Sequence, residues 1–273
     1  MSLLHPADAV FSTGVFTTAQ LHRGGSTDNQ IRRAVAAGDL IRLRPGWYAR
    51  VGADPRVVAA VTAGGVLSCV SALAHHGVWV SPGYSDLHVR RSKALRDGQR
   101  SCQAVGPPRP TTGAIDSVAV ALGCAVRCMR PEDWIAACDS ALNQGLAHGG
   151  DIVAELGPRG RDLLARCDAR SESGTESLAR VRLRAVGFAV IVQPQIEGVG
   201  RVDLRVGALL IECDSVAHHT SLANYRNDRR RDRAALVHGW LKIRLTYDDV
   251  VFGWDETLEA IRAVTVARRH RLR

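Results

Sequence analysis

Long apolar segments are missing from this chain of 273 residues. No run of about 18 uncharged apolar residues occurs, so the sequence predicts no transmembrane helix. The first residues, MSLLHPADAVFSTG, lack the basic and apolar regions of a signal peptide. Hydrophobic residues nevertheless make up 46% of the chain, which is ample for packed cores. We therefore expect a cytoplasmic globular protein.

Cysteine pairs of the C-x-x-C type are also missing. The cysteines are odd in number and scattered, at positions 69, 102, 124, 128, 138, 167 and 213. This pattern predicts no disulfide framework. Even the nearest pair, Cys124 and Cys128, has a spacing that suits no common zinc knuckle. We expect the cysteines to be small buried hydrophobic residues in a reducing compartment.

Lysine is almost absent. All but two of the 36 Lys and Arg residues are arginine, the exceptions being Lys93 and Lys242. A GC-rich genome can account for part of this bias. The net charge of +9 and the isoelectric point near 9.7 nevertheless favour a polyanionic partner. The expected partner is double-stranded DNA, and no membrane partner is expected.

The first predicted domain covers residues 1–52. TTAQLHRGG predicts a short helix that ends at two glycines, and STDNQIRRAVAAGDL predicts a second helix that opens with capping residues. LIRLRPGWYAR then predicts two strands around a Pro-Gly turn. Helix, turn, helix and hairpin together indicate a winged helix, whose second helix would enter the major groove.

DNA contacts are expected from side chains on this second helix and on the wing. The residues are Asn29, Arg32 and Arg33 on the helix and Arg42 and Arg44 beside the wing. The alternative is a small scaffold that packs on the next domain and touches no DNA.

The wing sequence GDLIRLRPGWY, residues 38–48, resembles the AbiEi antitoxin family, which commonly has a Pro-Gly-x-Tyr pattern there. Residues 53–165 resemble the connecting domain that follows such winged helices, which implies a positioning or interaction role without chemistry of its own. The resemblance also implies a toxin partner, with a repair partner as the other possibility. His75 and His76 in this segment are expected to be a packed helix end rather than a metal site.

The third predicted domain covers residues 170–273, with the order α-β-β-β-α-β-α. Side chains two apart on a strand share a face, so Glu212 and Asp214 project together, and Asp203 on the preceding strand can face them. Such a cluster is costly to bury unless a cation neutralises it. Oxygen ligands of this kind suit Mg²⁺ or Mn²⁺. We expect these carboxylates to bind metal, with ion pairs to arginines of the following helix as the alternative.

The same segment resembles the very-short-patch-repair-like endonucleases of the PD-(D/E)XK superfamily. Asp203 matches the motif aspartate, Glu212-Cys213-Asp214 matches E-x-D, and NDRRRD supplies Asp228, Arg231 and Asp232. The resemblance implies a restriction-endonuclease-like αβββαβ core. The implied catalytic residues are Asp203, Glu212, Asp214, His219, Glu176 and Gln195, with Arg231 positioning DNA.

Single residues of this set leave alternatives open. Glu176 is three residues after Ser173 and could be only the partner in a capping box. His219 would act as a general base or phosphate ligand, whereas His218 is expected to be an exposed loop residue. The sequence also departs from the resemblance, because Asp214 stands where most members have lysine and Ser215 where related members have glycine.

The predicted fold class is a multidomain α+β and α/β chain, with a winged helix, a mixed connecting domain and a restriction-endonuclease-like core. The function that these features predict is cleavage of a DNA phosphodiester with Mg²⁺ or Mn²⁺, in DNA repair or defence. The first alternative is a non-catalytic DNA-binding transcriptional regulator or antitoxin with a degenerate nuclease fold. The second is a nuclease fold acting on RNA or on a modified nucleotide.

Overall fold

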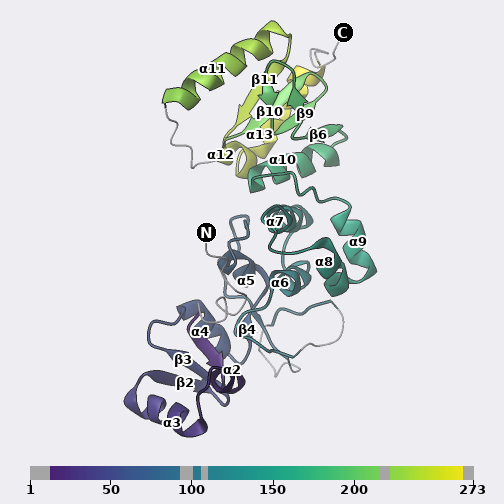
Figure 1. Ribbon diagram of the computed structural model, residues 1–273. Coiled ribbons are helices and arrows are strands. Elements are labelled where there is room, and N and C mark those ends of the chain that lie inside the picture. The colour runs from purple at the N-terminus through teal and green to yellow at the C-terminus, as the bar shows by residue number, and fades with distance from the viewer. Residues whose placement is uncertain (1–12, 93–100, 106–109, 215–221, 267–273) are drawn as a thin grey trace. The chain divides into compact units, whose positions relative to one another are not determined.

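A computed structural model describes residues 13–92, 101–105, 110–214 and 222–266 (Figure 1). The chain divides into two compact units. One comprises Met1–Val78, Pro82–Met129 and Ala147–Gly160, and the other comprises Trp79–Ser81, Arg130–Leu146 and Arg161–Arg273. Both units mix helices and strands, which confirms the mixed α/β class. No described helix is both long enough and apolar enough to cross a membrane.

The N-terminal unit begins with the predicted helix-turn-helix and hairpin. Its elements are β1 (Val15–Thr17), α2 (Thr18–Arg23), α3 (Asp28–Ala37), β2 (Leu40–Arg44) and β3 (Trp47–Arg50). Thr17 and Thr27 each start a helix through a capping box, in which a glutamine three residues later completes the pair of bonds. Gly38 ends α3 in the left-handed conformation, with φ 83°. The strands pair antiparallel in the order β1-β3-β2.

The winged helix shares an apolar core with the segment that follows it. This core includes Val15, Trp47, Val57, Val66 and Val89. The later elements of the unit are α4 (Pro55–Thr62), β4 (Val66–Leu67), α5 (Cys69–His75), β5 (Val89–Arg90), α6 (Val118–Ala125) and α8 (Gly149–Leu156). The domain border expected at residue 52 therefore lies within a continuous core, and the division into three domains stays a prediction.

The C-terminal unit is built on a four-stranded sheet with the order β11-β10-β9-β6. The strands are β6 (Val190–Val192), β9 (Leu204–Val206), β10 (Leu209–Cys213) and β11 (Leu241–Leu245). Only the β10–β11 pair of this sheet is parallel. A separate hairpin contains β7 (Gln195–Ile196) and β8 (Gly200–Arg201).

Helices precede and follow these strands in the chain. They are α7 (Pro131–Asn143), α10 (Gly174–Ala185), α11 (Leu222–Val237), α12 (Tyr247–Val251) and α13 (Trp254–Val266), while α9 (Pro158–Leu164) lies at the border between the units. The order from α10 to α13 follows the predicted one, with the hairpin and the short α12 added. Helix α7, which was expected in the connecting domain, groups with the C-terminal unit.

Alternate residues of β10 pack in two different cores. Leu209, Ile211 and Cys213 belong to the larger core, to which α10 and α13 also contribute residues. Leu210 belongs to a smaller core with Ile196, Val199, Val202 and Ala235. Since side chains alternate along a strand, Glu212 extends from the same face as Leu210. The carboxylate therefore lies beside the smaller core and does not enter the larger one.

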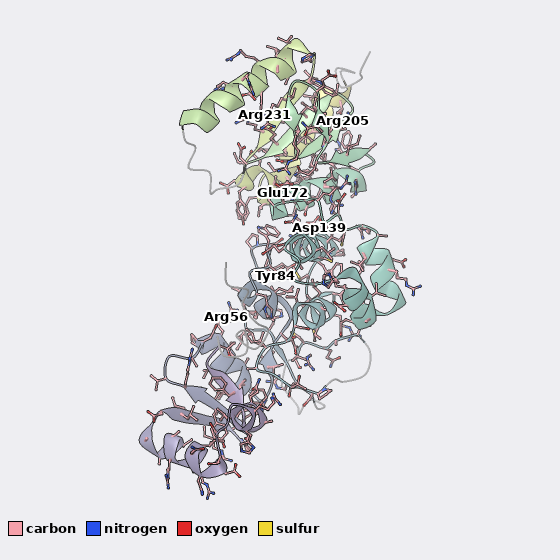
Figure 2. The ribbon with its side chains drawn as sticks, viewed as in Figure 1. Arg56, Tyr84, Asp139, Glu172, Arg205 and Arg231 are labelled. Carbon is pink, nitrogen blue, oxygen red and sulfur yellow. The ribbon has the colours of Figure 1, made fainter. Side chains whose placement is uncertain are left out.

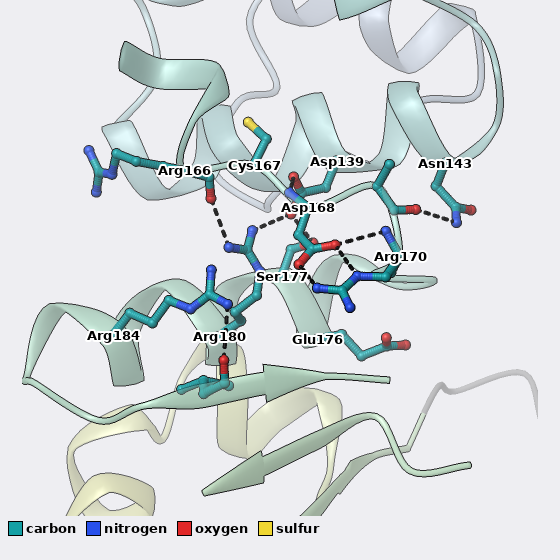
Figure 3. A network of polar contacts seen from close by, with 12 residues as sticks. Asp139, Asn143, Arg166, Cys167, Asp168, Arg170, Glu176, Ser177, Arg180 and Arg184 are labelled. Carbon is teal, nitrogen blue, oxygen red and sulfur yellow. Dashed lines mark hydrogen bonds and ion pairs between the residues drawn. The ribbon is translucent and has the colours of Figure 1, made fainter. Parts of the chain in front are cut away.

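A buried ion pair joins α7 to α10 (Figure 3). Asp139 and Arg180 have fully buried side chains, and a guanidinium nitrogen of Arg180 lies 2.5 Å from Oδ2 of Asp139. The same carboxylate accepts hydrogen bonds from the Ser177 hydroxyl at 2.7 Å and the Asp168 backbone N–H at 2.8 Å. These bonds satisfy both carboxylate oxygens and fix α10 against α7.

Candidate functional site

Helix α3 presents polar side chains on its exposed surface. Asn29, Arg32 and Arg33 are all exposed, whereas Ile31 is buried and holds the helix on its core. A guanidinium nitrogen of Arg32 donates to Oδ1 of Asn29 at 2.9 Å. The amide and the guanidinium thus form one polar patch on the face of α3 that does not pack. The three side chains expected to contact DNA are thus exposed on α3, and their contact with DNA stays a prediction.

The two arginines of the wing are placed differently. Arg42 is exposed on β2. Arg44 donates to the carbonyl oxygens of Gly64 and Gly65 at 3.1 and 3.0 Å, and its guanidinium lies 4.8 Å from the centre of the Trp47 ring. Burial lowers the pKa of Arg44. In the structure Arg44 anchors the wing to the segment just before β4, and the DNA contact expected of this residue stays a prediction.

A cavity of about 820 Å³ lies in the C-terminal unit. Four carboxylates expected at a catalytic site line it, and Figure 2 labels two of the other lining residues, Glu172 and Arg231. The carboxylates are Glu176, Asp203, Glu212 and Asp214, and the lining arginines are Arg201, Arg230, Arg231 and Arg244. The cavity thus combines acidic and basic groups.

The carboxyl groups of Asp203 and Glu176 both lie near the side-chain amide of Gln193. The amide nitrogen of Gln193 donates to Oε2 of Glu176 at 2.9 Å and lies 3.5 Å from Oδ1 of Asp203. The other oxygen of Asp203 accepts the backbone N–H of Cys213 at 2.8 Å. Burial raises the pKa of both carboxyls. The charge of Asp203 further raises the pKa of Glu176, and the charge of Glu212 further raises that of Asp203.

Glu176 also helps to start α10. Its Oε2 accepts the backbone N–H of Glu172 at 3.0 Å, while the Ser173 hydroxyl accepts the N–H of Glu176 at 3.2 Å. Figure 3 shows the carboxyl group of Glu176 turned away from Asp139. The capping box weighed as the alternative is not completed, because the Glu176 carboxylate accepts the N–H of Glu172 rather than that of Ser173, and the side chain lines the cavity.

Glu212 is surrounded by three cations from two elements, β11 and α11. Lys242 on β11 places its Nζ 2.8 Å from Oε2 of Glu212, and Arg244 lies 3.5 Å from the same oxygen. Arg231 on α11 lies 3.2 Å from the other oxygen. Lys242 also pairs with Asp232 at 2.7 Å. The ion pairs weighed as the alternative are thus present at Glu212, and Lys242 of the neighbouring strand is one of the partners.

Two expected positions differ in the structure. Gln195 is exposed on β7 and does not line the cavity, whereas Gln193, two residues earlier, occupies the place between the carboxylates with a φ of 48°. Arg231 donates to the backbone carbonyl oxygens of Val199 and Arg201, so it holds the β7–β8 hairpin as well as lining the cavity.

Some expected residues fall outside the described part. His218, His219 and Ser215 lie in the segment that the structure does not describe, as does the side chain of Asp228. The oxygens of Asp203, Glu212 and Asp214 line one cavity, but these residues are not a group of potential metal ligands within 4.8 Å of one another in the described chain. Metal binding by the three carboxylates stays a prediction.

Comparison with known proteins bears on the N-terminal unit. Residues 8–51 match a family model described as a transcriptional regulator, AbiEi antitoxin. No curated protein matches the chain. The matched segment ends just after β3, at the end of the wing. The N-terminal segment, from before β1 through the wing, is thus similar to the AbiEi antitoxin family of transcriptional regulators.

Proposed function

We propose that this chain binds duplex DNA through its winged helix and acts as a transcriptional regulator of the antitoxin kind. The observation that carries the proposal is the exposed set Asn29, Arg32 and Arg33 on α3, within the segment similar to AbiEi regulators. Arginine can donate two hydrogen bonds to guanine and asparagine can pair with adenine in the major groove. Arg42 on the wing would contact the phosphate backbone.

Substituting surface arginines tests this proposal without opening a core. Deleting the winged helix would expose the apolar core that it shares with α4 and β4. In Arg32→Ala/Arg33→Ala we expect the affinity for DNA to fall at least about tenfold, because one arginine contact is worth about 1–3 kcal/mol. The slope of log K against log salt should also become shallower by about 2 if both contact phosphates. Fluorescence anisotropy over a salt series measures both quantities.

The matched control is Arg127→Ala/Arg262→Ala, which removes the same charge from exposed positions outside the winged helix. This variant should keep DNA affinity within about twofold, since only the general electrostatic field changes. Equal losses in the two double variants would contradict a recognition role for α3.

A second proposal is that the C-terminal unit hydrolyses DNA phosphodiesters with a divalent metal. It is supported by Glu176, which is buried, and Asp203, which is partly buried. Both carboxyls lie beside the side-chain amide of Gln193 in the cavity that Glu212 also lines. The order of helices and strands agrees with the αβββαβ core that the nuclease resemblance implies.

The donor set fits a hard divalent cation in charge and in ligand type. Burial raises the pKa of Glu176 and Asp203, and a neighbouring carboxylate raises it further, Asp203 for Glu176 and Glu212 for Asp203; a cation would offset these effects. A bound Mg²⁺ would polarise a phosphodiester and supply hydroxide. Lys242 fixes Glu212, and Arg244 at the cavity wall would hold a phosphate oxygen. The competing interpretation is a degenerate site, in which the cations around Glu212 replace the metal.

Metal binding should be visible in thermal stability. We expect Mg²⁺ or Mn²⁺ to stabilise the parent protein by about 2.7 kcal/mol at a concentration of 100 Kd, and Asp203→Asn by much less. Asparagine keeps an oxygen that can accept the Cys213 N–H, so the variant removes charge with little change in shape. Glu259→Gln, an exposed change on α13, is the control and should respond like the parent. Equal responses of all three proteins would place any metal elsewhere.

A further inference from the structure

A second cluster of potential ligands lies in the N-terminal unit, away from the residues discussed so far. The ligand atoms of Cys69, His88, Cys102 and Cys128 all lie within 4.8 Å of one another. Sγ of Cys102 lies 3.3 Å from Nδ1 of His88 and 3.9 Å from Sγ of Cys128. The four residues are far apart in the sequence, so only the fold brings them together.

These distances match the edges of a zinc tetrahedron. With Zn–S bonds of about 2.3 Å and Zn–N bonds of about 2.0–2.1 Å, a tetrahedral site separates two sulfurs by about 3.8 Å and a sulfur from a nitrogen by about 3.6 Å. The two separations of 3.9 and 3.3 Å are close to these values. Three thiols and one imidazole also form one of the common ligand sets of structural zinc.

The backbone places each ligand through its own hydrogen bonds. Cys69 begins α5 with a positive φ of 52°, a conformation that a residue with a side chain rarely adopts. The N–H of Ser68 donates to the carbonyl oxygen of His88 at 3.1 Å, and the N–H of Cys102 donates to that of Val89 at 2.8 Å. Cys128 follows the end of α6. The cluster thus lies where four parts of the chain meet. They are the start of α5, the segment that follows α6, the start of β5 and the segment around Cys102.

We propose that Cys69, His88, Cys102 and Cys128 bind one structural Zn²⁺ ion. Four protein ligands leave no open position for water or substrate, so the site would stabilise the fold and take no part in catalysis. The metal would stabilise a region with little regular sheet structure. Strands β4 and β5 are each two residues long and form a separate two-stranded sheet. The free energy of metal binding would contribute directly to folding of this unit.

Packing of cysteines as small hydrophobic residues, which the sequence favoured, does not account for this cluster. Cys138 and Cys213 fit that interpretation, since both are buried and Cys213 belongs to the larger apolar core of the C-terminal unit. In the cluster, however, an imidazole joins three thiols, and only Cys69 is fully buried. A disulfide is not formed either, because the 3.9 Å between the sulfurs of Cys102 and Cys128 is far above the bond length of about 2.05 Å.

Metal analysis of the full-length protein tests the proposal. Protein produced with zinc in the medium should contain about one zinc per chain by inductively coupled plasma mass spectrometry. Cys128→Ser should lose most of this zinc, whereas Cys124→Ser, four residues earlier on α6 and outside the cluster, should retain it. A parent protein without zinc, or equal zinc in both variants, would overturn the proposal.

A measurement on the parent alone covers the case in which a variant does not fold. Thiol alkylation under native conditions should leave Cys69, Cys102 and Cys128 unmodified, and a chelator should make these three reactive while Cys167 reacts equally in both samples. Refilling with Co²⁺ should give the visible absorption bands of a tetrahedral thiolate site. Identical alkylation with and without chelator would overturn the proposal, as would an intact mass lighter by two hydrogens, which indicates a disulfide.

Discussion

Replacing Asp203 by asparagine is expected to abolish metal-dependent cleavage of DNA by this protein. The substitution removes the charge of the partly buried carboxylate that lies near Glu176 beside the Gln193 amide, and a divalent ion would lose an anionic ligand. DNA binding should stay unchanged, because the winged helix that we expect to bind DNA lies in the other unit. Nicking of supercoiled plasmid in Mg²⁺ and in Mn²⁺ measures cleavage, and anisotropy measures binding.

The control for this experiment is Glu259→Gln, which changes an exposed carboxylate outside the cavity and should cut like the parent. The substrates should include plain, mismatched and single-stranded DNA and also RNA. If the parent cuts none of them in either metal, the C-terminal unit is not a nuclease and the regulator alone remains. The proposal of DNA binding by α3 would not be affected by that result.

Replacing Asp139 by alanine is expected to destabilise the C-terminal unit by about 3–5 kcal/mol. The change leaves the Arg180 guanidinium charged, fully buried and without its carboxylate, and it also removes the acceptor of Ser177. Urea unfolding followed by tryptophan fluorescence measures the effect. The signal reports mainly on this unit, because it contains Trp79, Trp134, Trp240 and Trp254, while only Trp47 lies in the other.

An exposed ion pair in the same unit provides the comparison. Arg170 pairs with Asp168 at 2.7 Å, but the Arg170 side chain is 63% exposed. Arg170→Ala should therefore cost no more than about 1 kcal/mol. The double variant Asp139→Leu/Arg180→Met should be more stable than Asp139→Ala, since no uncompensated charge remains in it. A loss of less than 1 kcal/mol in Asp139→Ala would show that the pair does not hold α10 against α7.

Local sequence signals predicted the winged helix well. Thr27 and Gly38 delimit α3 through a side-chain cap and a left-handed glycine, and both effects depend on residues within a few positions. The hairpin followed from the Pro-Gly turn between β2 and β3. The alternation along β10 likewise predicted that Glu212 would leave the core lined by Ile211 and Cys213. In each case the information needed is carried by neighbouring residues.

The functional side chains depended on contacts between distant segments. Arg42 and Arg44 look alike in the sequence. In the structure Arg44 differs because it donates hydrogen bonds to the carbonyl oxygens of Gly64 and Gly65, which are twenty or more positions away. Gln193 and Gln195 are equally plausible by type, and the backbone turn at Gln193 decides which of them reaches Asp203. Lys242 approaches Glu212 because β11 pairs in parallel with β10, a register that the sequence does not show.

The sequence by itself determined the winged helix, the order of the main helices and strands of the C-terminal unit, and the basic charge, because propensity, capping and periodicity act over short distances. The tertiary structure alone decided which polar groups face one another. The cluster of Cys69, His88, Cys102 and Cys128 is the clearest case, since no spacing motif links residues that four different segments supply. Long-range packing sets such positions, because one helix or strand can bring together residues that are dozens of positions apart.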